Sequence, residues 1–167
     1  MEKDKVENIS TQQTASMEDY LEAIAILAEE GYPVKVTEIG KALGVKKPSV
    51  TSALAKLSEA GLVQHEKYGD VVLTAEGARI GQDVYQRHRT LRHFLVEILN
   101  VDPSVAEADA CRMEHAVSQT TIERLTKFLD FVLNCPRGEA EWLKGLNYYF
   151  EHGKRDEELL AKCQREE

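Results

Sequence analysis

The segment CRMEH, residues 111–115, brings a thiol, a carboxylate and an imidazole together within five positions. Cys111, Glu114 and His115 stand at i, i+3 and i+4, and these offsets place side chains on one face of a helix. Thiolate, carboxylate and imidazole groups are all common ligands of transition metals. The segment therefore predicts a metal-binding face on a helix.

Each of these residues also has a plainer explanation when it is taken alone. A single histidine is more often a surface or core residue than a metal ligand, and a lone cysteine usually behaves as a small apolar side chain. Met113, inside the segment, is assigned to the core. Whether the segment binds a metal therefore depends on what the rest of the chain provides.

The composition is that of an ordinary globular protein, and it excludes several classes. The 167 residues, 43% of them hydrophobic and 30% charged, suit one mid-sized domain or two small ones. No run approaches the roughly 18 apolar residues that span a membrane, and residues 1–15 are polar, as expected of a flexible tail rather than a secretory signal. The three cysteines lack the spacing of a disulfide framework. We therefore expect a cytoplasmic protein with no membrane partner.

The net charge of −8 argues against a protein that coats nucleic acid without regard to sequence. Positive charge is nevertheless concentrated in one region, which holds Lys41, Lys46, Lys47, Lys56 and Lys67. Such a local cluster is compatible with a DNA-binding surface on an acidic protein.

Periodic apolar residues and capping signals predict a mainly α-helical chain. Thr37 and Thr74 are expected to cap helices, and Gly44 and Gly61 to end them. Two short β-compatible runs flank the turn signal at residues 68–70. The helices are predicted at residues 17–30, 38–43, 48–60, 75–99, 103–117, from Ser118 to the break at Cys135, and 141–153.

The order of a helix, a short helix, a turn, a helix and a hairpin is typical of a winged helix-turn-helix. The second half is entirely helical, and its apolar stripe with Phe128 and Phe131 favours a dimer interface, with an intramolecular core as the alternative. We therefore predict a flexible tail, a winged helix-turn-helix DNA-binding domain, a helical metal-binding and dimerisation domain, and a charged C-terminal helix or tail, over residues 1–15, 16–86, 87–152 and 153–167.

The helix that begins at Pro48 is the predicted recognition helix. Its first turn offers small hydroxyl groups that can approach bases or phosphates, and lysines lie where they would meet the DNA backbone. The alternative is ordinary helix-start chemistry with solubilising lysines. The predicted DNA contacts are Lys46, Lys47, Pro48, Ser49, Thr51, Ser52 and Lys56, with Lys67 and Tyr68 in the wing.

Several motifs, taken in order, resemble the diphtheria toxin repressor family of metal-dependent transcriptional repressors. They are MEDYLEAI, PSVT, GLV, LTAEG, RH at residues 87–88 and CRMEH, and together they extend over roughly residues 16–150. The resemblance implies that Asp19 and Glu22 of the first helix join His88, Cys111, Glu114 and His115 in a site for one or two metal ions. Asp19 and Glu22 are also i, i+3 neighbours, although Asp19 could instead complete a helix cap after Ser16.

The sequence departs from both branches of that family. Manganese regulators usually have Glu where Cys111 stands, whereas iron-dependent members usually have Met where Asp19 stands. A thiolate favours iron and carboxylates suit manganese, so the resemblance implies Fe2+ or Mn2+, with Co2+, Ni2+, Zn2+ or Cd2+ able to substitute. Arg92 occupies a position where the family commonly has Glu, and a cation there opposes an ancillary metal ion.

The function we expect is that of a homodimeric, metal-activated repressor that binds palindromic operator DNA, with metal-uptake genes as the targets that the resemblance implies. A winged-helix regulator that senses an organic ligand is the alternative, in which the CRMEH face is structural. A metalloenzyme is disfavoured because the chain has no HExxH helix, phosphate loop or nucleophile-base pair. We therefore expect neither catalysis nor an organic substrate.

Overall fold

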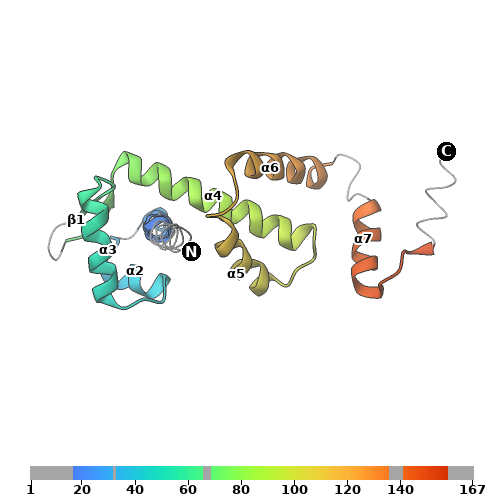
Figure 1. Ribbon diagram of the computed structural model, residues 1–167, viewed down its shortest axis with the longest axis horizontal. Coiled ribbons are helices and arrows are strands. Elements are labelled where there is room, and N and C mark those ends of the chain that lie inside the picture. The colour runs from blue at the N-terminus through green and yellow to red at the C-terminus, as the bar shows by residue number, and fades with distance from the viewer. Residues whose placement is uncertain (1–16, 32, 66–68, 136–140, 158–167) are drawn as a thin grey trace, which may run out of the picture. The chain divides into compact units, whose positions relative to one another are not determined.

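Helices make up most of the chain, and one short antiparallel hairpin interrupts them (Figure 1). The computed structural model describes residues 17–31, 33–65, 69–135 and 141–157. Ser16, Lys67 and Tyr68, for which the sequence predicted roles, lie outside these residues. The chain divides into two compact units between Gln86 and Arg87.

The first unit is a helix-turn-helix followed by a hairpin. It contains a first helix at residues 17–29, α2 (Val36–Ala42), α3 (Lys47–Glu59), β1 (Val63–His65), β2 (Val71–Leu73) and the beginning of α4 (Ala75–Glu97). Gly44 has a φ of 65°, which a side chain with a Cβ rarely adopts, and this residue allows the tight turn between α2 and α3. The strands pair antiparallel, with Val63 opposite Leu73. One apolar core holds these elements together, built from residues that include Leu21, Ile24, Ile39, Val50, Leu54, Leu57, Val63 and Val71.

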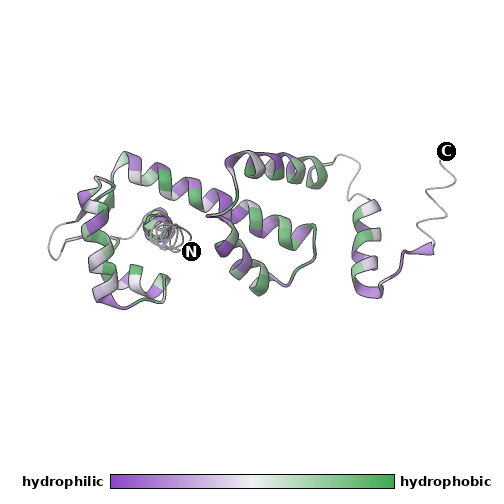
Figure 2. Cartoon of the chain, viewed as in Figure 1, coloured by the Kyte–Doolittle hydropathy of each residue, from purple (hydrophilic) through white to green (hydrophobic). Residues whose placement is uncertain are grey.

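The second unit contains the end of α4 with α5 (Pro103–Met113), α6 (Gln119–Leu133) and α7 (Glu141–His152). The helices are apolar on one side, as Figure 2 shows most clearly along α6. Two apolar clusters form the core, one around Leu91, Ala110 and Ile122, the other around Ile98, Leu129, Val132 and Leu143. Within the described part of the chain, no helix has the length and apolar character needed to cross a membrane.

The structure confirms the mainly helical class and most of the predicted capping signals. Thr74 Oγ1 accepts a hydrogen bond from the Gly77 N–H at 3.1 Å, and Ser118 Oγ accepts one from the Thr121 N–H at 3.3 Å. Gly61, with a φ of 72°, follows the end of α3. These local hydrogen bonds replace the ones that a helix end lacks.

Two predicted helix ends are wrong. The N-cap of α2 is Lys35 and not Thr37, because the Glu38 carboxylate accepts a hydrogen bond from the Lys35 N–H at 3.0 Å and closes the first turn two residues earlier. The helix predicted at 103–117 ends at Met113, since the N–H groups of both Ala116 and Val117 bond to the Met113 carbonyl in a tight turn. Glu114 and His115 therefore lie in the turn that follows α5.

Candidate metal centre and nucleic-acid interface

Glu114 is a carboxylate with no exposed surface. It follows Ala106 and Ala110 at intervals of four residues, so it continues the buried face of α5. Alanine at both positions keeps this face narrow and apolar. The buried face of α5 therefore leads to a buried carboxylate. Burying this charge is costly in free energy unless an opposite charge lies close by.

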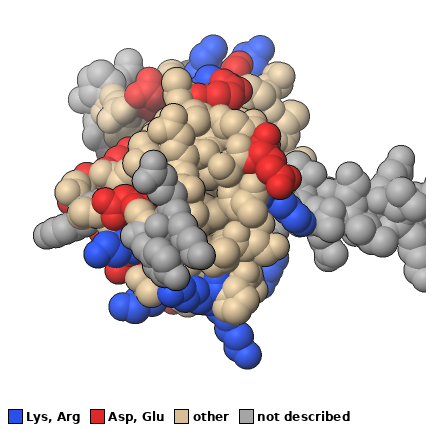
Figure 3. All heavy atoms as spheres, turned by 90° about the vertical axis from the view of Figure 1, so that its left-hand side faces the viewer, with Lys and Arg blue, Asp and Glu red and all other residues tan. Residues whose placement is uncertain are grey.

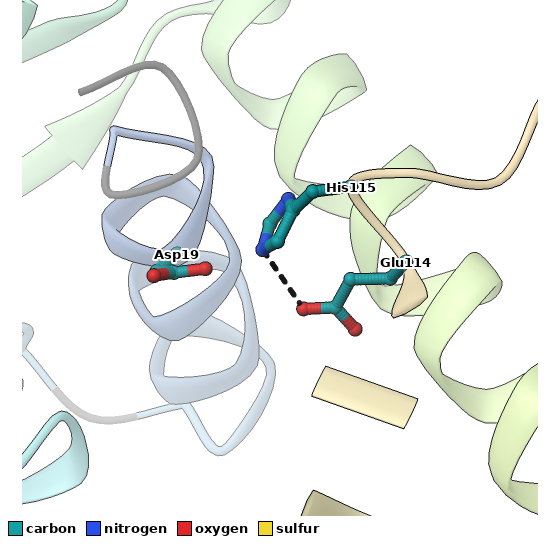
Figure 4. Close-up of side chains that lie close together, drawn as sticks. All are labelled: Asp19, Glu114 and His115. Carbon is teal, nitrogen blue, oxygen red and sulfur yellow. Dashed lines mark ion pairs between the residues drawn. The ribbon is translucent and has the colours of Figure 1, made fainter. Parts of the chain in front are cut away.

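Two imidazoles approach the Glu114 carboxylate. His88 Nδ1 lies 2.8 Å from Oε2, and His115 Nε2 lies 3.2 Å from Oε1. Figure 4 shows the second of these ion pairs, with His115 pointing at the carboxylate of its neighbour in the chain. Oε1 is buried and has no partner in hydrogen-bonding geometry, because His115 is close to it but poorly aligned. One carboxylate oxygen therefore keeps its capacity to bind a cation.

His88 reaches this position because it lies on the buried stripe of α4. Val84 precedes it by four residues and Leu91 follows it by three, and both are about 1% exposed. The His88 side chain is itself only 12% exposed. An imidazole held on an apolar stripe beside a buried carboxylate is a donor set that fits a divalent transition metal.

Two further residues extend this arrangement to the surface. Glu107 Oε1 lies 3.1 Å from His88 Nε2, and Arg92 Nε lies 2.8 Å from Glu107 Oε2. Sequence reasoning did not include Glu107 in the site. The signal was available, because Glu107 precedes Glu114 by seven residues, two turns of helix, on the same side of α5.

The first helix carries the other two predicted carboxylates, Asp19 and Glu22, both partly buried. Figure 4 shows Asp19 on this helix. The helix packs very closely on α4, since a Cβ added to Gly81 would lie 2.6 Å from the Leu21 carbonyl oxygen. Burial, and secondly the charge of Asp19, raise the pKa of the neighbouring Tyr20 hydroxyl. The Asp19 carboxylate therefore lies close enough to the Tyr20 hydroxyl for its charge to act on that group.

Cys111 differs from the other predicted ligands of its segment, because its side chain is exposed. The groups of close donor atoms among the described residues do not include it. Its backbone belongs to the last turn of α5, next to the buried Ala110. Ligation by Cys111 remains a prediction.

The exposed face of α3 carries all the described residues that were predicted to contact DNA. Val50, Ala53, Leu54 and Leu57 bury the opposite face in the core. The exposed residues are Lys46, Lys47, Pro48, Ser49, Thr51, Ser52 and Lys56. Figure 3, which views the protein from the side of α3 and the hairpin, shows lysine and arginine side chains projecting from its lower margin.

A shallow hollow lies beside the beginning of α3. Lys47 and Thr51 line it together with Lys35, the N-cap of α2, Thr37 of α2 and His65 of β1. The Thr51 hydroxyl donates to the Lys47 carbonyl at 3.1 Å, which leaves its lone pairs available as acceptors. Lys35 and Thr37 did not enter the sequence prediction, because only the tertiary packing of α2 on α3 brings them to this surface.

Two family models match consecutive parts of the chain. The model of the iron dependent repressor N-terminal DNA binding domain matches residues 12–71. The model of the iron dependent repressor metal binding and dimerisation domain matches residues 74–143. The first contains α3 and most of the hairpin, and the second contains His88, Glu107, Glu114 and His115.

Similar proteins are transcriptional regulators. An uncharacterized HTH-type transcriptional regulator of Methanocaldococcus jannaschii is 39% identical over 116 residues, which are 69% of this chain and 93% of that protein. The regulator MntR of Bacillus subtilis is 37% identical over 118 residues, 71% of this chain and 82% of MntR.

Solved structures show the same fold. The manganese regulator SloR is 32% identical, with a TM-score of 0.62, over 69% of this chain and 54% of SloR. The T. acidophilum protein IdeR is 25% identical, with a TM-score of 0.58, over 67% of this chain and 53% of IdeR. The chain thus spans about half the length of these solved regulators.

Proposed function

Because the chain belongs to the diphtheria toxin repressor family of metal-dependent transcriptional repressors, we propose that a divalent cation held at Glu114 switches its affinity for operator DNA. The family consists of repressors and not of enzymes. The dimer that the matched dimerisation domain indicates would present two recognition helices to the two halves of a palindromic operator.

The observation that carries this proposal is the burial of Glu114. Its carboxylate has no exposed surface, touches two imidazoles, and retains one oxygen without a hydrogen-bond partner. A divalent ion would offset the free-energy cost of burying the Glu114 charge, and the buried charge would in turn favour binding of the ion. The donor atoms around Glu114 thus fit the metal that the family requires.

We propose that the ligands come from both units. Glu114, His115 and His88 would bind from the second unit, and Asp19 and Glu22 from the first helix. The bound ion supplies positive charge that both sets of donors share. Shared ligation would favour the arrangement of the two units that binds DNA, and a coupling of about 1–3 kcal/mol changes DNA affinity roughly 5–150-fold.

We propose Mn2+ or Fe2+ as the activating ion. The carboxylates of Asp19, Glu22 and Glu114 are hard oxygen donors that suit Mn2+, and relatives such as SloR are manganese regulators. The Cys111 thiol is a softer donor that favours Fe2+, so we propose Fe2+ as the alternative to Mn2+. A repressor that responds to such an ion would control genes for its uptake.

The DNA contacts are proposed on the exposed face of α3. The hydroxyls of Ser49, Thr51 and Ser52 would approach base edges or phosphates, and Lys46 and Lys47 would contact the backbone. Lys35 and Thr37, which line the hollow beside Lys47, would extend the phosphate contacts to α2.

The test is anaerobic fluorescence anisotropy on DNA from upstream of the gene for this protein, at fixed salt. Protein is titrated without metal, with Mn2+ and with Fe2+, first as wild type and then as His115→Ala. His93→Ala is the matched control, because His93 is an exposed histidine outside the Glu114 cluster. We expect tight binding only with metal, lost in His115→Ala and kept in His93→Ala.

Equal DNA affinity with and without metal would contradict the proposal and make the Glu114 cluster a structural feature. The better of the two ions would identify the activator. Repeating the titration with Cys111→Ser would then show whether the thiol contributes to that choice.

A further inference from the structure

Glu107 connects His88 to Arg92 in a continuous series of contacts within the second unit. Arg92 Nε lies 2.8 Å from Glu107 Oε2, Glu107 Oε1 lies 3.1 Å from His88 Nε2, and His88 Nδ1 lies 2.8 Å from Glu114 Oε2. The two outer side chains, Arg92 and Glu107, are 44% and 58% exposed, whereas His88 is 12% exposed and Glu114 has no exposed surface. The series leads from the surface to the buried carboxylate.

The local sequence accounts for this arrangement. His88 and Arg92 are i, i+4 neighbours on α4, so their side chains lie one turn apart on the same face. Glu107 and Glu114 are seven residues apart and lie on the side of α5 that meets α4. Each carboxylate therefore meets a different nitrogen of the same imidazole.

Two carboxylates around one histidine would ordinarily offer ligands for two cations. Here the outer carboxylate already has a cation, because the Arg92 guanidinium is permanently charged and contacts it directly. A divalent cation beside Glu107 would be repelled by that guanidinium. Its attraction to the carboxylate would also be weak, because the guanidinium already compensates the carboxylate charge. Glu107 is therefore a poor ligand for a second ion.

Glu107 is instead well placed to orient His88. A histidine that binds a metal through one ring nitrogen commonly donates its other N–H to a carboxylate, and this hydrogen bond fixes the tautomer and the ring orientation. In the tautomer that donates Nε2–H to Glu107, the Nδ1 lone pair faces the buried carboxylate, and a bound cation would take the place of the Nδ1 contact with Glu114 Oε2. Arg92 keeps Glu107 in position by pairing with the other oxygen of the Glu107 carboxylate, Oε2.

We propose that Arg92 and Glu107 are a positioning pair that holds His88 toward Glu114 and keeps divalent cations from binding at Glu107. The pair would act through His88 and would not touch the ion. This inference rests on the proposed function, because it concerns the same metal centre.

The experiment counts bound Mn2+ on the full-length chain by the electron paramagnetic resonance signal of the unbound ion, which gives both stoichiometry and affinity. The reference is the number of Mn2+ ions that the wild type binds per subunit. Arg92→Glu removes the cation and adds a carboxylate, and it should bind one Mn2+ more than the wild type. Arg124→Glu, the same charge reversal at an exposed position of α6, is the matched control and should bind the wild-type number.

Glu107→Gln tests orientation separately from ion number. This variant keeps the size of the side chain but weakens the acceptor, and Mn2+ affinity should fall about 10–100-fold while the number of bound ions stays that of the wild type. A purely structural role for the pair would change neither the affinity of Glu107→Gln nor the ion count of Arg92→Glu. Should Arg92→Glu fail to fold by circular dichroism, Arg92→Gln replaces it, and one additional, weaker Mn2+ is expected there.

The inference is overturned, and the proposed function stays intact, if Arg92→Glu binds the wild-type number of Mn2+ ions and Glu107→Gln keeps the wild-type affinity. Absence of Mn2+ and Fe2+ binding by the wild type would instead overturn the proposed function.

Discussion

At Glu114, a carboxylate is held out of solvent between two imidazoles, His88 and His115. A buried carboxylate is expensive to ionise unless cations surround it, and under the proposed function a bound ion would supply part of that compensation. The Glu114 side chain would then couple the stability of the second unit to metal binding.

The first prediction concerns Glu114→Gln, which keeps the side-chain volume and removes the charge. Wild type should gain about 2.7 kcal/mol in the free energy of unfolding when Mn2+ is present at 100 times its dissociation constant. Glu114→Gln should lose this gain, as measured by urea unfolding with and without Mn2+. Glu123→Gln, an exposed glutamate of α6, should behave as wild type. An undiminished Mn2+ effect in Glu114→Gln would show that this carboxylate is not a ligand.

The second prediction concerns Asp102, the N-cap of α5. Hydrogen bonds from the Ser104 hydroxyl, and then from the N–H groups of Ser104 and Val105, lower the pKa of the Asp102 carboxyl. Its contribution to stability is thus fully present above the pKa of the unfolded chain and is lost as pH falls through the lower pKa of the folded chain. Asp102→Ala should lower the melting temperature at pH 7, and the gap to wild type should narrow in acid. A gap that is the same at both pH values would contradict this account.

At the scale of elements, close helix packing positions the two carboxylates of the first helix. Gly81 of α4 lies against the Leu21 carbonyl, where an added Cβ would be 2.6 Å from the oxygen and 3.1 Å from the Ala25 side chain. Asp19 and Glu22 precede and follow Leu21 on that helix. The absence of a side chain at Gly81 therefore sets how near these carboxylates are held to α4.

The third prediction is that Gly81→Ala destabilises the protein. In an unconstrained helix this change would stabilise by about 1 kcal/mol, because alanine has the higher helix propensity. Here the added methyl group should force the first helix away from α4 and lower the free energy of unfolding by about 1–3 kcal/mol. Urea unfolding measures the sign directly, and a more stable variant would contradict the close contact.

The fourth prediction concerns the exposed face of α3. If Lys47 contacts a phosphate, Lys47→Ala should weaken binding to all DNA sequences alike and reduce the slope of log affinity against log salt by about 0.9. Lys127→Ala, an exposed lysine of α6, is the control and should leave the slope unchanged. An unaltered slope in Lys47→Ala would remove this lysine from the interface.

At the scale of the whole molecule, the apolar stripe of α6 serves two purposes. Ile122, Leu129 and Val132 are buried in the second unit, which confirms part of the alternative of an intramolecular core. Phe131 is nevertheless 82% exposed. Because α6 lies in the region matched by the metal binding and dimerisation domain, this exposed side chain is our candidate contact between subunits.

The fifth prediction is that Phe131→Glu shifts the protein from dimer to monomer in sedimentation velocity. A charge placed at an apolar contact would be desolvated without a partner. Operator affinity should fall as well, since a monomer engages one half-site. Lys127→Glu on the same helix is the control, and a dimer that survives Phe131→Glu would direct attention to the exposed Trp142 of α7.

The amino-acid sequence by itself determined the helical class, the order of the elements and most of their ends. These features depend on local interactions, such as the Thr74 and Ser118 caps and the positive φ of Gly44, and local interactions are encoded within a few residues. The CRMEH segment is likewise encoded within five residues, and the sequence by itself identifies it as a candidate metal-binding segment.

Only the tertiary structure decided which of those residues are buried together. It buries Glu114 and exposes Cys111, although both belong to one short segment, because α5 ends at Met113 and turns its alanine face toward α4. It also brings Glu107 between His88 and Arg92, a contact across 15 to 19 residues that no local pattern contains. Burial and long-range charge pairing arise from helix packing, and these two properties distinguish a candidate cation site from a polar helix face.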